Sequence, residues 1–455
     1  MTPRKNLTFL LSASAFAASL ALAGCTPKDV APPSAAASGA GAPATGSKKL
    51  VIAWAEWQPA KQLQKLCDDY TKETGTAVEV QQIPWSDFET KVKTAWSAQS
   101  SDFDMVVGDS QWLGKGATQG HYVDLTDWAK TNVPISDIAK SALAEYGEYP
   151  AGSGKLWGLP CMSDATVFAY RKDLFNDPAN KTAFKAKYGK ELAPPDTWDD
   201  FKNVAEFFTQ PNKQYGAALF FSKEYDGATM GFDQVLWAYG GQLSDPSGKK
   251  IEGVLNNPTG VKALQFYADL KKFTPPGSEN YYFSECLRDF QQGKVAMAQS
   301  WFAFLPDLTD KEKNAKYLDQ TGYFIIPKGP SGRFVSLGGQ GLSISAYSKQ
   351  QDAAKKFVAW FEKGDTQLKW AKLGGLTANT KVAATDTFKK ATPYNVYFTQ
   401  SVPYLKDFYN TPNYSELLTI SQNDLNSAIA GQKSPKDALD DIAKVQQASM
   451  DGMGK

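Results

Sequence analysis

The segment that decides the fold runs from residue 50 to residue 107 and begins with LVIAWA, Leu50 to Ala55. This short apolar run predicts a buried strand. The residues after it predict a helix, because Pro59 suits a first helical turn and apolar side chains recur from Leu63 at i, i+3, i+4 and i+7. Gly75 is the expected stop of this helix.

The same alternation continues to residue 107. Residues 77–81 predict a second strand, and residues 103–107 predict a third. Between them lies a predicted helix that Ser86 and Glu89 would open as a capping box. Right-handed crossovers would place the three strands in one parallel sheet, so the pattern indicates an α/β fold.

The ends of these strands carry aromatic and acidic side chains. Glu56 and Trp57 follow the first strand, Trp85 follows the second, and Asp109 and Trp112 follow the third. Open α/β sheets bind ligands beyond the carboxyl ends of their strands. We therefore expect these five residues to converge on one ligand-binding rim.

Composition limits the classes of function. The 455 residues carry 49 Lys and Arg against 48 Asp and Glu, without the basic excess of a nucleic-acid-binding protein. His121 is the only histidine, so a His-rich metal site is excluded and no metal is expected. The length predicts two or three domains.

The N-terminus is typical of an exported protein. Arg4 and Lys5 precede an uncharged stretch, residues 7–23, that is short for a membrane span. The stretch ends in LAGC, residues 22–25, which resembles the lipobox of bacterial lipoproteins. This resemblance implies lipidation of Cys25 and removal of residues 1–24 as a signal peptide. The alternative is an ordinary secretory signal with an accidental cysteine.

A flexible tether is expected over residues 25–47. Of the 22 residues from 26 to 47, 17 are Ala, Pro, Ser or Gly, which leaves too little apolar surface for a packed core. No later segment has 18 consecutive apolar residues, so we expect a soluble body held at a membrane surface.

Later segments repeat helix signals, and three cysteines follow Cys25. Helix starts are expected at Thr197, Asn257 and Ser434, and a helix over residues 354–361 is expected to end at Gly364. Of the cysteines, Cys67 falls on an apolar helix face, where a buried free thiol is expected. If any pair forms a disulfide, Cys161 with Cys286 is the expected one.

Short motifs along the chain together resemble family 1 extracellular solute-binding proteins. These are the sugar-type receptors of bacterial ABC importers, and maltose-binding protein is the best-known member. No single motif is diagnostic, but their order and spacing follow the family pattern. The motifs lie at residues 49–54, 70–75, 103–109, 158–175, 195–201, 293–301 and 338–361.

The resemblance implies a two-lobe, periplasmic-binding-protein-like α/β fold with discontinuous domains and a ligand cleft between the lobes. The N-lobe would hold residues 48–160 and 340–385, and the C-lobe residues 161–339 and 386–455. Segments near 159–160 and 338–341 would act as the hinge. The closed form would dock on the transmembrane subunits of an ABC permease, as a monomer in the periplasm or extracytoplasmic space, without a cofactor.

Sugar chemistry adds four candidates to the five on the rim. A pyranose has an apolar face that suits aromatic rings and hydroxyls that suit carboxylates and amides. Trp301 occupies a position where the family often presents a stacking aromatic from the C-lobe. Asp164, Gln340 and Trp237 are the other candidates for contact with the solute.

Two other functions remain open at this stage. The same fold could bind a polyamine or a metal chelate, since such receptors also have acidic, Trp-rich clefts. A secreted carbohydrate-active enzyme could use Glu56 and Asp109 as paired carboxylates, although no catalytic residue is assigned. The predicted helix around Tyr414–Leu425 lacks the tryptophan that maltose-binding protein offers to long glucans, so a solute that is smaller than a maltodextrin or different from it is expected.

Overall fold

The computed structural model describes residues 49–453, and its first five elements follow the predicted alternation. They are β1 (Leu50–Ala55), α1 (Gln58–Thr74), β2 (Val78–Ile83), α2 (Trp85–Ser97) and β3 (Met105–Asp109). β1 pairs in parallel with both β2 and β3, which confirms the predicted parallel sheet. α1 ends at Gly75, whose φ of 75° lies in the left-handed region that favours glycine.

The remaining elements alternate less regularly. The other strands are β4 (Leu159–Arg171), β5 (Tyr215–Ala218), β6 (Val295–Trp301), β7 (Thr321–Phe324), β8 (Val335–Ile344) and β9 (Leu405–Lys406). The helices up to β8 are α3 (Ser110–Thr118), α4 (Thr126–Asn132), α5 (Lys140–Tyr146), α6 (Lys172–Asn176), α7 (Pro178–Tyr188), α8 (Trp198–Phe208), α9 (Gly227–Ala238), α10 (Pro258–Asp269), α11 (Phe283–Gln291) and α12 (Pro306–Thr309). Those after β8 are α13 (Gln351–Phe361), α14 (Gly364–Lys372), α15 (Thr380–Ala383), α16 (Asp386–Ala391), α17 (Asn395–Ser401), α18 (Tyr414–Ile429) and α19 (Pro435–Met453).

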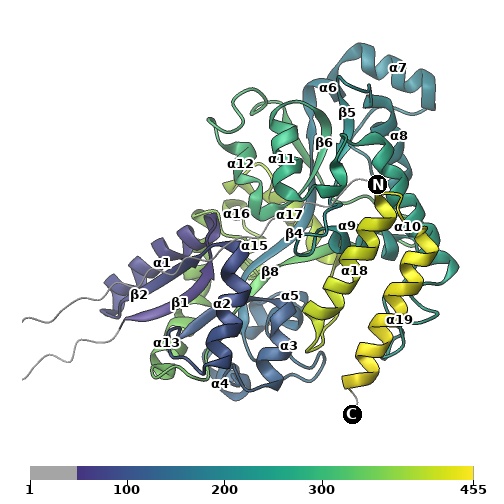
Figure 1. Ribbon diagram of the computed structural model, residues 1–455. Coiled ribbons are helices and arrows are strands. Elements are labelled where there is room, and N and C mark those ends of the chain that lie inside the picture. The colour runs from purple at the N-terminus through teal and green to yellow at the C-terminus, as the bar shows by residue number, and fades with distance from the viewer. Residues whose placement is uncertain (1–48, 454–455) are drawn as a thin grey trace, which may run out of the picture. The chain divides into compact units, whose positions relative to one another are not determined.

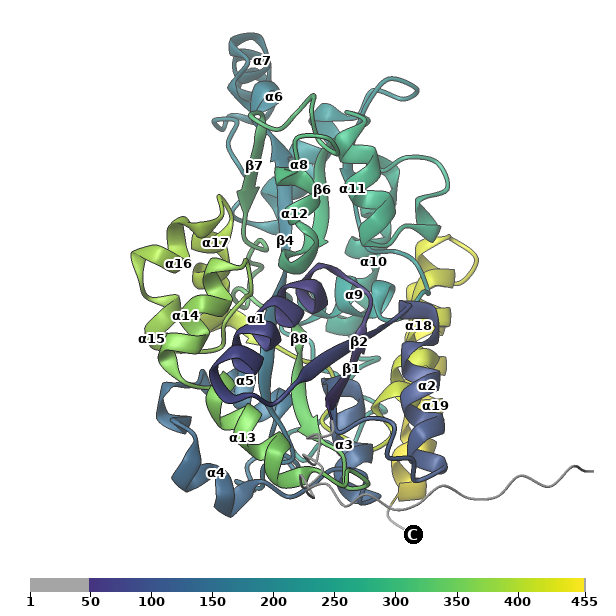
Figure 2. The same cartoon turned by 90° about the vertical axis from the view of Figure 1, so that its left-hand side faces the viewer.

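One strand joins two groups of strands. The described strands follow the order β2-β1-β3-β8-β4-β6-β5, with β7 beside β4 and β9 beside β8. The first half of β4 pairs with β8, and from Thr166 onward β4 pairs instead with β6 and β7. We call β1–β3 the first strand group and β5–β7 the second strand group. β4 runs from the first to the second in both views (Figure 1, Figure 2).

Helices lie beside both strand groups, and two long helices lie along one flank of the molecule. α1 and α2 lie beside the first group, and α8 and α11 lie beside the second (Figure 1). α18 and α19 run side by side along one flank (Figure 1, Figure 2). Every residue of α9 is buried, so this helix belongs to the core. Within residues 49–453, no helix combines the length and apolar character that crossing a membrane requires.

Local signals predicted several helix boundaries correctly. Thr197 accepts a hydrogen bond from the N–H of Asp200 at the start of α8, and Asn257 caps α10 in the same way. Ser434 does so before α19. The predicted capping box at Ser86 is wrong, because α2 begins one residue earlier, directly after Pro84.

Two further expectations are corrected by the structure. Gly364 does not end α13 but is the first residue of α14, because the chain turns after Glu362 and begins a second helix almost at once. Cys161 and Cys286 are not bonded to each other: both are buried free thiols, as is Cys67. Cys161 lies on β4 and Cys286 on α11, where each packs as a small apolar side chain. Cys25, the signal peptide and the tether lie outside the described residues.

Candidate functional site

A cavity of about 430 Å³ lies where the first strand group meets the second. Its walls come from the start of α2, the end of β3, the middle of β4, the end of β6 and residues 337–340 of β8. Residues 224–226, Asp407 and Tyr414, the first residue of α18, complete the lining. The volume falls within the range of about 300–1,000 Å³ that is usual for small-molecule sites.

Six of the nine predicted solute-contacting residues line this cavity: Trp57, Trp85, Asp109, Asp164, Trp301 and Gln340. Strand register brings the strand residues together. Asp109 at the end of β3 stands opposite Gln340 of β8, and Asp164 of β4 stands opposite Gly338 of the same strand. Because β8 pairs with both β3 and β4, residues far apart in sequence reach one edge of the sheet.

The other three predicted residues lie outside the cavity lining. Glu56 is exposed at the surface beyond β1. Trp112 is only 1% exposed, and its ring packs against Phe88, 5.1 Å away between ring centroids, because the first turn of α3 rotates it into the core. Trp237 is also 1% exposed, within α9, and the ammonium of Lys406 lies 4.8 Å from its ring. The expectation that these residues reach the cleft is not supported by their positions.

Aromatic rings form much of the cavity wall. Trp57 packs against Trp85 at 5.3 Å and against Phe304 at 5.5 Å between ring centroids. Trp85 packs against Tyr225 at 5.7 Å. Phe304 in turn stacks on Phe283 at 3.8 Å, with the two planes 7° apart. Trp57 and Trp85 follow strands of the first group, whereas the other three rings lie near the second, so these contacts bridge the cavity.

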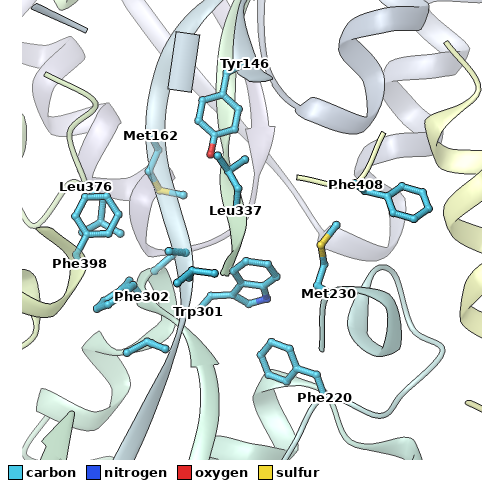
Figure 3. Packing of buried hydrophobic residues seen from close by; sticks show 14 of the residues in the cluster. Tyr146, Met162, Phe220, Met230, Trp301, Phe302, Leu337, Leu376, Phe398 and Phe408 are labelled. Carbon is cyan, nitrogen blue, oxygen red and sulfur yellow. The ribbon is translucent and has the colours of Figure 1, made fainter. Parts of the chain in front are cut away.

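Trp301 is held on the opposite wall. It is the last residue of β6, and its indole N–H donates a hydrogen bond to the hydroxyl of Tyr282 at 2.9 Å. The ring lies among Leu337, Met230 and Phe220 (Figure 3). These contacts fix one ring orientation, and therefore the shape of this wall.

Four aspartates, which we call the cavity aspartates, line the same space: Asp109, Asp164, Asp226 and Asp407. Asp109 accepts hydrogen bonds from the hydroxyl of Tyr225 at 3.1 Å and from the N–H of Gln111 at 3.3 Å. The hydroxyl of Tyr282 donates to Asp226. The cavity aspartates are therefore fixed in place by donors of the surrounding chain.

The other two cavity aspartates each accept a hydrogen bond from the N–H of the residue that follows them. Asp164 accepts from the N–H of Ala165 at 2.8 Å and from that of Ala303 at 3.2 Å. Asp407 accepts through Oδ1 from the N–H of Phe408 at 2.7 Å and from the hydroxyl of Tyr414 at 2.8 Å. Both carboxyl groups thus keep a defined orientation toward the cavity.

Removal from bulk water raises the pKa of each cavity aspartate. The pKa of Asp109 rises to about 7, and the pKa values of Asp164 and Asp226 rise to about 8. Burial also raises the pKa of Asp407. The direction is the same in all four because burial penalises the charged form more than the hydrogen bonds stabilise it.

Comparison with known proteins identifies the family. The model of the bacterial extracellular solute-binding protein family matches residues 54–367. This chain belongs to that family. The sequence resemblance is thereby confirmed, and so is the two-lobe α/β fold, which solved structures of the family share. As a member, this solute-binding protein is the extracytoplasmic receptor of an ABC importer. The receptor binds a small solute and passes it to a permease. It is not an enzyme.

Three relatives illustrate the similarity. A probable ABC transporter-binding protein of Deinococcus radiodurans is 29% identical over 309 residues, covering 65% of this chain and 67% of its own. A mannitol-binding protein of Pseudomonas aeruginosa is 30% identical over 211 residues, covering 46% of this chain and 45% of its own. The crystal structure of a solute-binding protein of Agrobacterium radiobacter in complex with ribitol is 26% identical, with a TM-score of 0.75 and coverage of 88% of this chain and 98% of that one.

Sequence reasoning missed several residues that line the cavity of this solute-binding protein. These residues lie in loops or at the start of α18 and do not follow the end of a predicted strand, which was the signal used for the five candidates on the rim. They are Tyr225, Asp226, Tyr282, Asp407 and Tyr414. The clearest structural mark is at Tyr225, whose φ of 49° is left-handed although it is not glycine. Such strain costs of order 1–3 kcal/mol and is concentrated at functional sites.

The cavity offers hydrogen-bonding atoms that the described chain leaves unused. The indole N–H groups of Trp57 and Trp85 and the amide Nε2 of Gln340 have no hydrogen-bond acceptor within residues 49–453. Oδ2 of Asp407 has no donor in the same range. Residues that line the cavity therefore carry both unpaired donors and an unpaired acceptor, all buried, and a hydroxyl group could satisfy either kind because it both donates and accepts.

Proposed function

We propose that this receptor captures a small polyhydroxylated solute, either a polyol or a sugar of one or two rings. The observation that carries the proposal is the combination in one cavity of aromatic walls with unused donors and an unused carboxylate oxygen. The C–H face of such a solute would lie on the rings, and its hydroxyls would pair with the free atoms. Binding is favourable only if nearly all of these polar groups find partners.

The relatives support this class of solute over the alternatives. One relative is named for mannitol, one for arabino-oligosaccharides, and one structure holds ribitol. These names favour polyhydroxylated compounds over polyamines and metal chelates. Within residues 49–453, no group of three or more His, Cys, Asp and Glu side chains is arranged to hold a metal ion.

The contacts of the solute follow from the two sides of the cavity. The N-lobe would contact the solute through Trp57, Trp85 and Asp109. The C-lobe would contact it through Trp301 and Asp164. Gln340 lies between the two sides on β8 and would donate through Nε2. Because α18 contributes Tyr414 and no tryptophan, a short solute suits the cavity better than a long glucan.

Closure of the lobes would trap the solute. The lobes are proposed to divide at residues 48–160 with 340–385 and at residues 161–339 with 386–455. Segments 159–160 and 338–341 lie on the paired strands β4 and β8, where small changes in φ and ψ would reorient one lobe against the other. The contacts of Trp57 with Phe304, of Trp85 with Tyr225 and of Tyr225 with Asp109 are among those that opening would break.

Membrane attachment is proposed from the N-terminal sequence. Lipid on Cys25, after removal of residues 1–24, would hold a monomeric receptor near its permease through the tether. Labelling of intact cells with a radioactive fatty acid tests this. Loss of the label in a Cys25→Ala variant is expected, and a label that persists would refute the anchor.

A thermal-shift screen tests the proposed function. The purified protein is heated with polyols, monosaccharides, disaccharides, polyamines and metal chelates. A bound solute present at 100 times its Kd raises the free energy of unfolding by about 2.7 kcal/mol. Stabilisation by a polyol or sugar, recovered chemically unchanged, is the expected result. Stabilisation by polyamines or chelates alone would refute the proposal.

A further inference from the structure

The cavity is strongly acidic and carries no compensating charge of its own. Six carboxylates line it, namely those of the cavity aspartates and of Glu89 and Glu224, whereas no Lys, Arg or His does. Glu89 forms an ion pair with Lys93, which lies outside the lining. Within residues 49–453, none of the cavity aspartates forms an ion pair. Where these carboxyl groups are ionised, a neutral solute would leave their charge uncompensated.

Hydrogen-bond donors surround the cavity aspartates and partly offset the cost of ionising these buried groups. The groups bonded to them are donors, either backbone N–H groups or tyrosine hydroxyls. Hydrogen bonds from such donors favour the ionised form of a carboxyl group.

One carboxylate oxygen is left over for a ligand. Asp407 is 8% exposed, and its two bonds to Phe408 and Tyr414 both end on Oδ1. Oδ2 is buried and makes no hydrogen bond that meets normal geometry within residues 49–453. The Ser110 hydroxyl offsets part of the rise that burial causes in the pKa of this carboxyl group, and Asp407 adds to the rise that burial causes in the pKa of the nearby Glu145. A buried, unpaired carboxylate is strongly unfavourable, so a positively charged donor is the group that suits this position best.

The walls also favour an organic cation over a metal ion. Trp57, Trp85, Trp301, Tyr225 and Phe304 present aromatic rings, which attract ammonium groups through their π faces. No group of three or more metal-ligating side chains within residues 49–453 is placed to bind a metal.

We infer that the solute of this receptor is a polyhydroxylated compound bearing a protonated amine, such as an amino-polyol or an amino sugar. The ammonium group would donate to Oδ2 of Asp407, with the rings of the cavity around its carbon skeleton. The hydroxyls would use the free N–H groups of Trp57, Trp85 and Gln340. This inference rests on the proposed function and narrows its class of solute.

The ionisation of the cavity agrees with this assignment. Burial raises the pKa of Asp407 and brings that of Asp164 to about 8, so without a nearby positive charge burial favours the protonated acids. A bound ammonium would supply that positive charge and favour the ionised carboxylates.

Matched ligands test the inference by isothermal titration calorimetry at pH 8 with the purified protein. The probes are D-sorbitol and 1-amino-1-deoxy-D-sorbitol, which share one skeleton, and the N-acetyl derivative of the latter, which is neutral. D-mannitol and its 1-amino derivative form a second pair. We expect the amine to bind at least tenfold more tightly than the polyol or the acetamide in one pair or both.

Each outcome of this titration decides the inference. If a neutral polyol binds as tightly as its amine or more tightly, the inference that the solute bears a protonated amine is refuted, and the proposed function stands. If no member of either pair binds while a neutral sugar stabilises the protein in the thermal screen, the inference is again refuted. If no polyhydroxylated compound binds at all, both proposals fail.

The variant Asp407→Asn locates the ammonium. Its Oδ1 can keep the bonds from Phe408 and Tyr414, so the change is confined to the unpartnered atom, which becomes a donor. We expect the affinity ratio of amine to polyol to fall at least fivefold, with the folded state verified by thermal unfolding. Glu416→Gln removes an exposed charge from the same helix as Tyr414 and should leave the ratio unchanged. An unchanged ratio in Asp407→Asn would refute the placement.

Discussion

Replacing Trp57 with alanine removes a ring that contacts Phe304 across the cavity. This side chain is half-buried and contacts Trp54, Trp85 and Phe304 at 5.3–5.6 Å between ring centroids. Aromatic pairs are worth about 0.5–1.5 kcal/mol each, so three pairs amount to roughly 1.5–4.5 kcal/mol of the free energy of unfolding. Because Trp57 is only half-buried, we expect a loss in the lower half of that range.

The effect on solute binding is separate from this loss of stability. Truncating a tryptophan that forms the wall of a binding site removes about 1–3 kcal/mol of binding free energy, which corresponds to roughly 5- to 150-fold in Kd. Isothermal titration with the best solute from the thermal screen measures it, at a temperature where the variant is fully folded.

Trp128→Ala is the matched control. Trp128 is also half-buried, but it lies on α4 and does not line the cavity. We expect its variant to bind within twofold of the wild type. If Trp57→Ala also binds within twofold, the ring is not a wall of the site. If both variants lose affinity equally, the loss reflects a general weakening of the fold.

Three further predictions concern the cavity wall, ionisation and the cysteines. Gly338→Ala would place its Cβ 2.6 Å from the ring of Trp301, so we expect the ring to be displaced and the Kd of the solute to rise at least tenfold in calorimetry; an unchanged Kd would show that this ring does not shape the site. The pKa of Asp164 is about 8 in the folded protein and near 3.9 in unfolded chains. Between these two pH values the folded state binds a proton that the unfolded state has lost. The free energy of unfolding should therefore fall as the pH rises toward 8. Melting temperatures of the unliganded protein at pH 5.5 and 8.5 measure this fall, which should be smaller in Asp164→Asn; an equal fall in that variant would contradict the assignment. Dithiothreitol should leave the melting temperature unchanged, because Cys161 and Cys286 are free thiols; a lower value would indicate a disulfide.

Local patterns predicted the part of the site that lies at strand ends. The register of β1, β2 and β3 follows from their apolar runs, so Trp57, Trp85 and Asp109 could be placed at one edge from sequence. Trp112 was misplaced because it lies inside the first turn of α3, where the rotation of the helix and not the strand end decides its direction. Glu56 is exposed and does not line the cavity, although it directly follows β1.

The rest of the site depends on long-range packing that no local pattern encodes. Asp407 and Tyr414 reach the cavity only because the chain returns across β8 and starts α18 beside α9. Tyr225 depends on a strained loop whose carbonyl accepts a hydrogen bond from Gln422, almost 200 residues later. Trp237 has the residue type of a sugar platform, but α9 is buried on all sides, which removes its ring from any cleft.

A crystal structure of the protein with its best-binding solute tests the central claim most directly. We expect one solute molecule, chemically intact, inside the 430 Å³ cavity, in contact with Trp57 and Asp109 on one side and with Trp301 and Asp164 on the other. A solute bound elsewhere, with these four side chains untouched at saturating concentration, would contradict it.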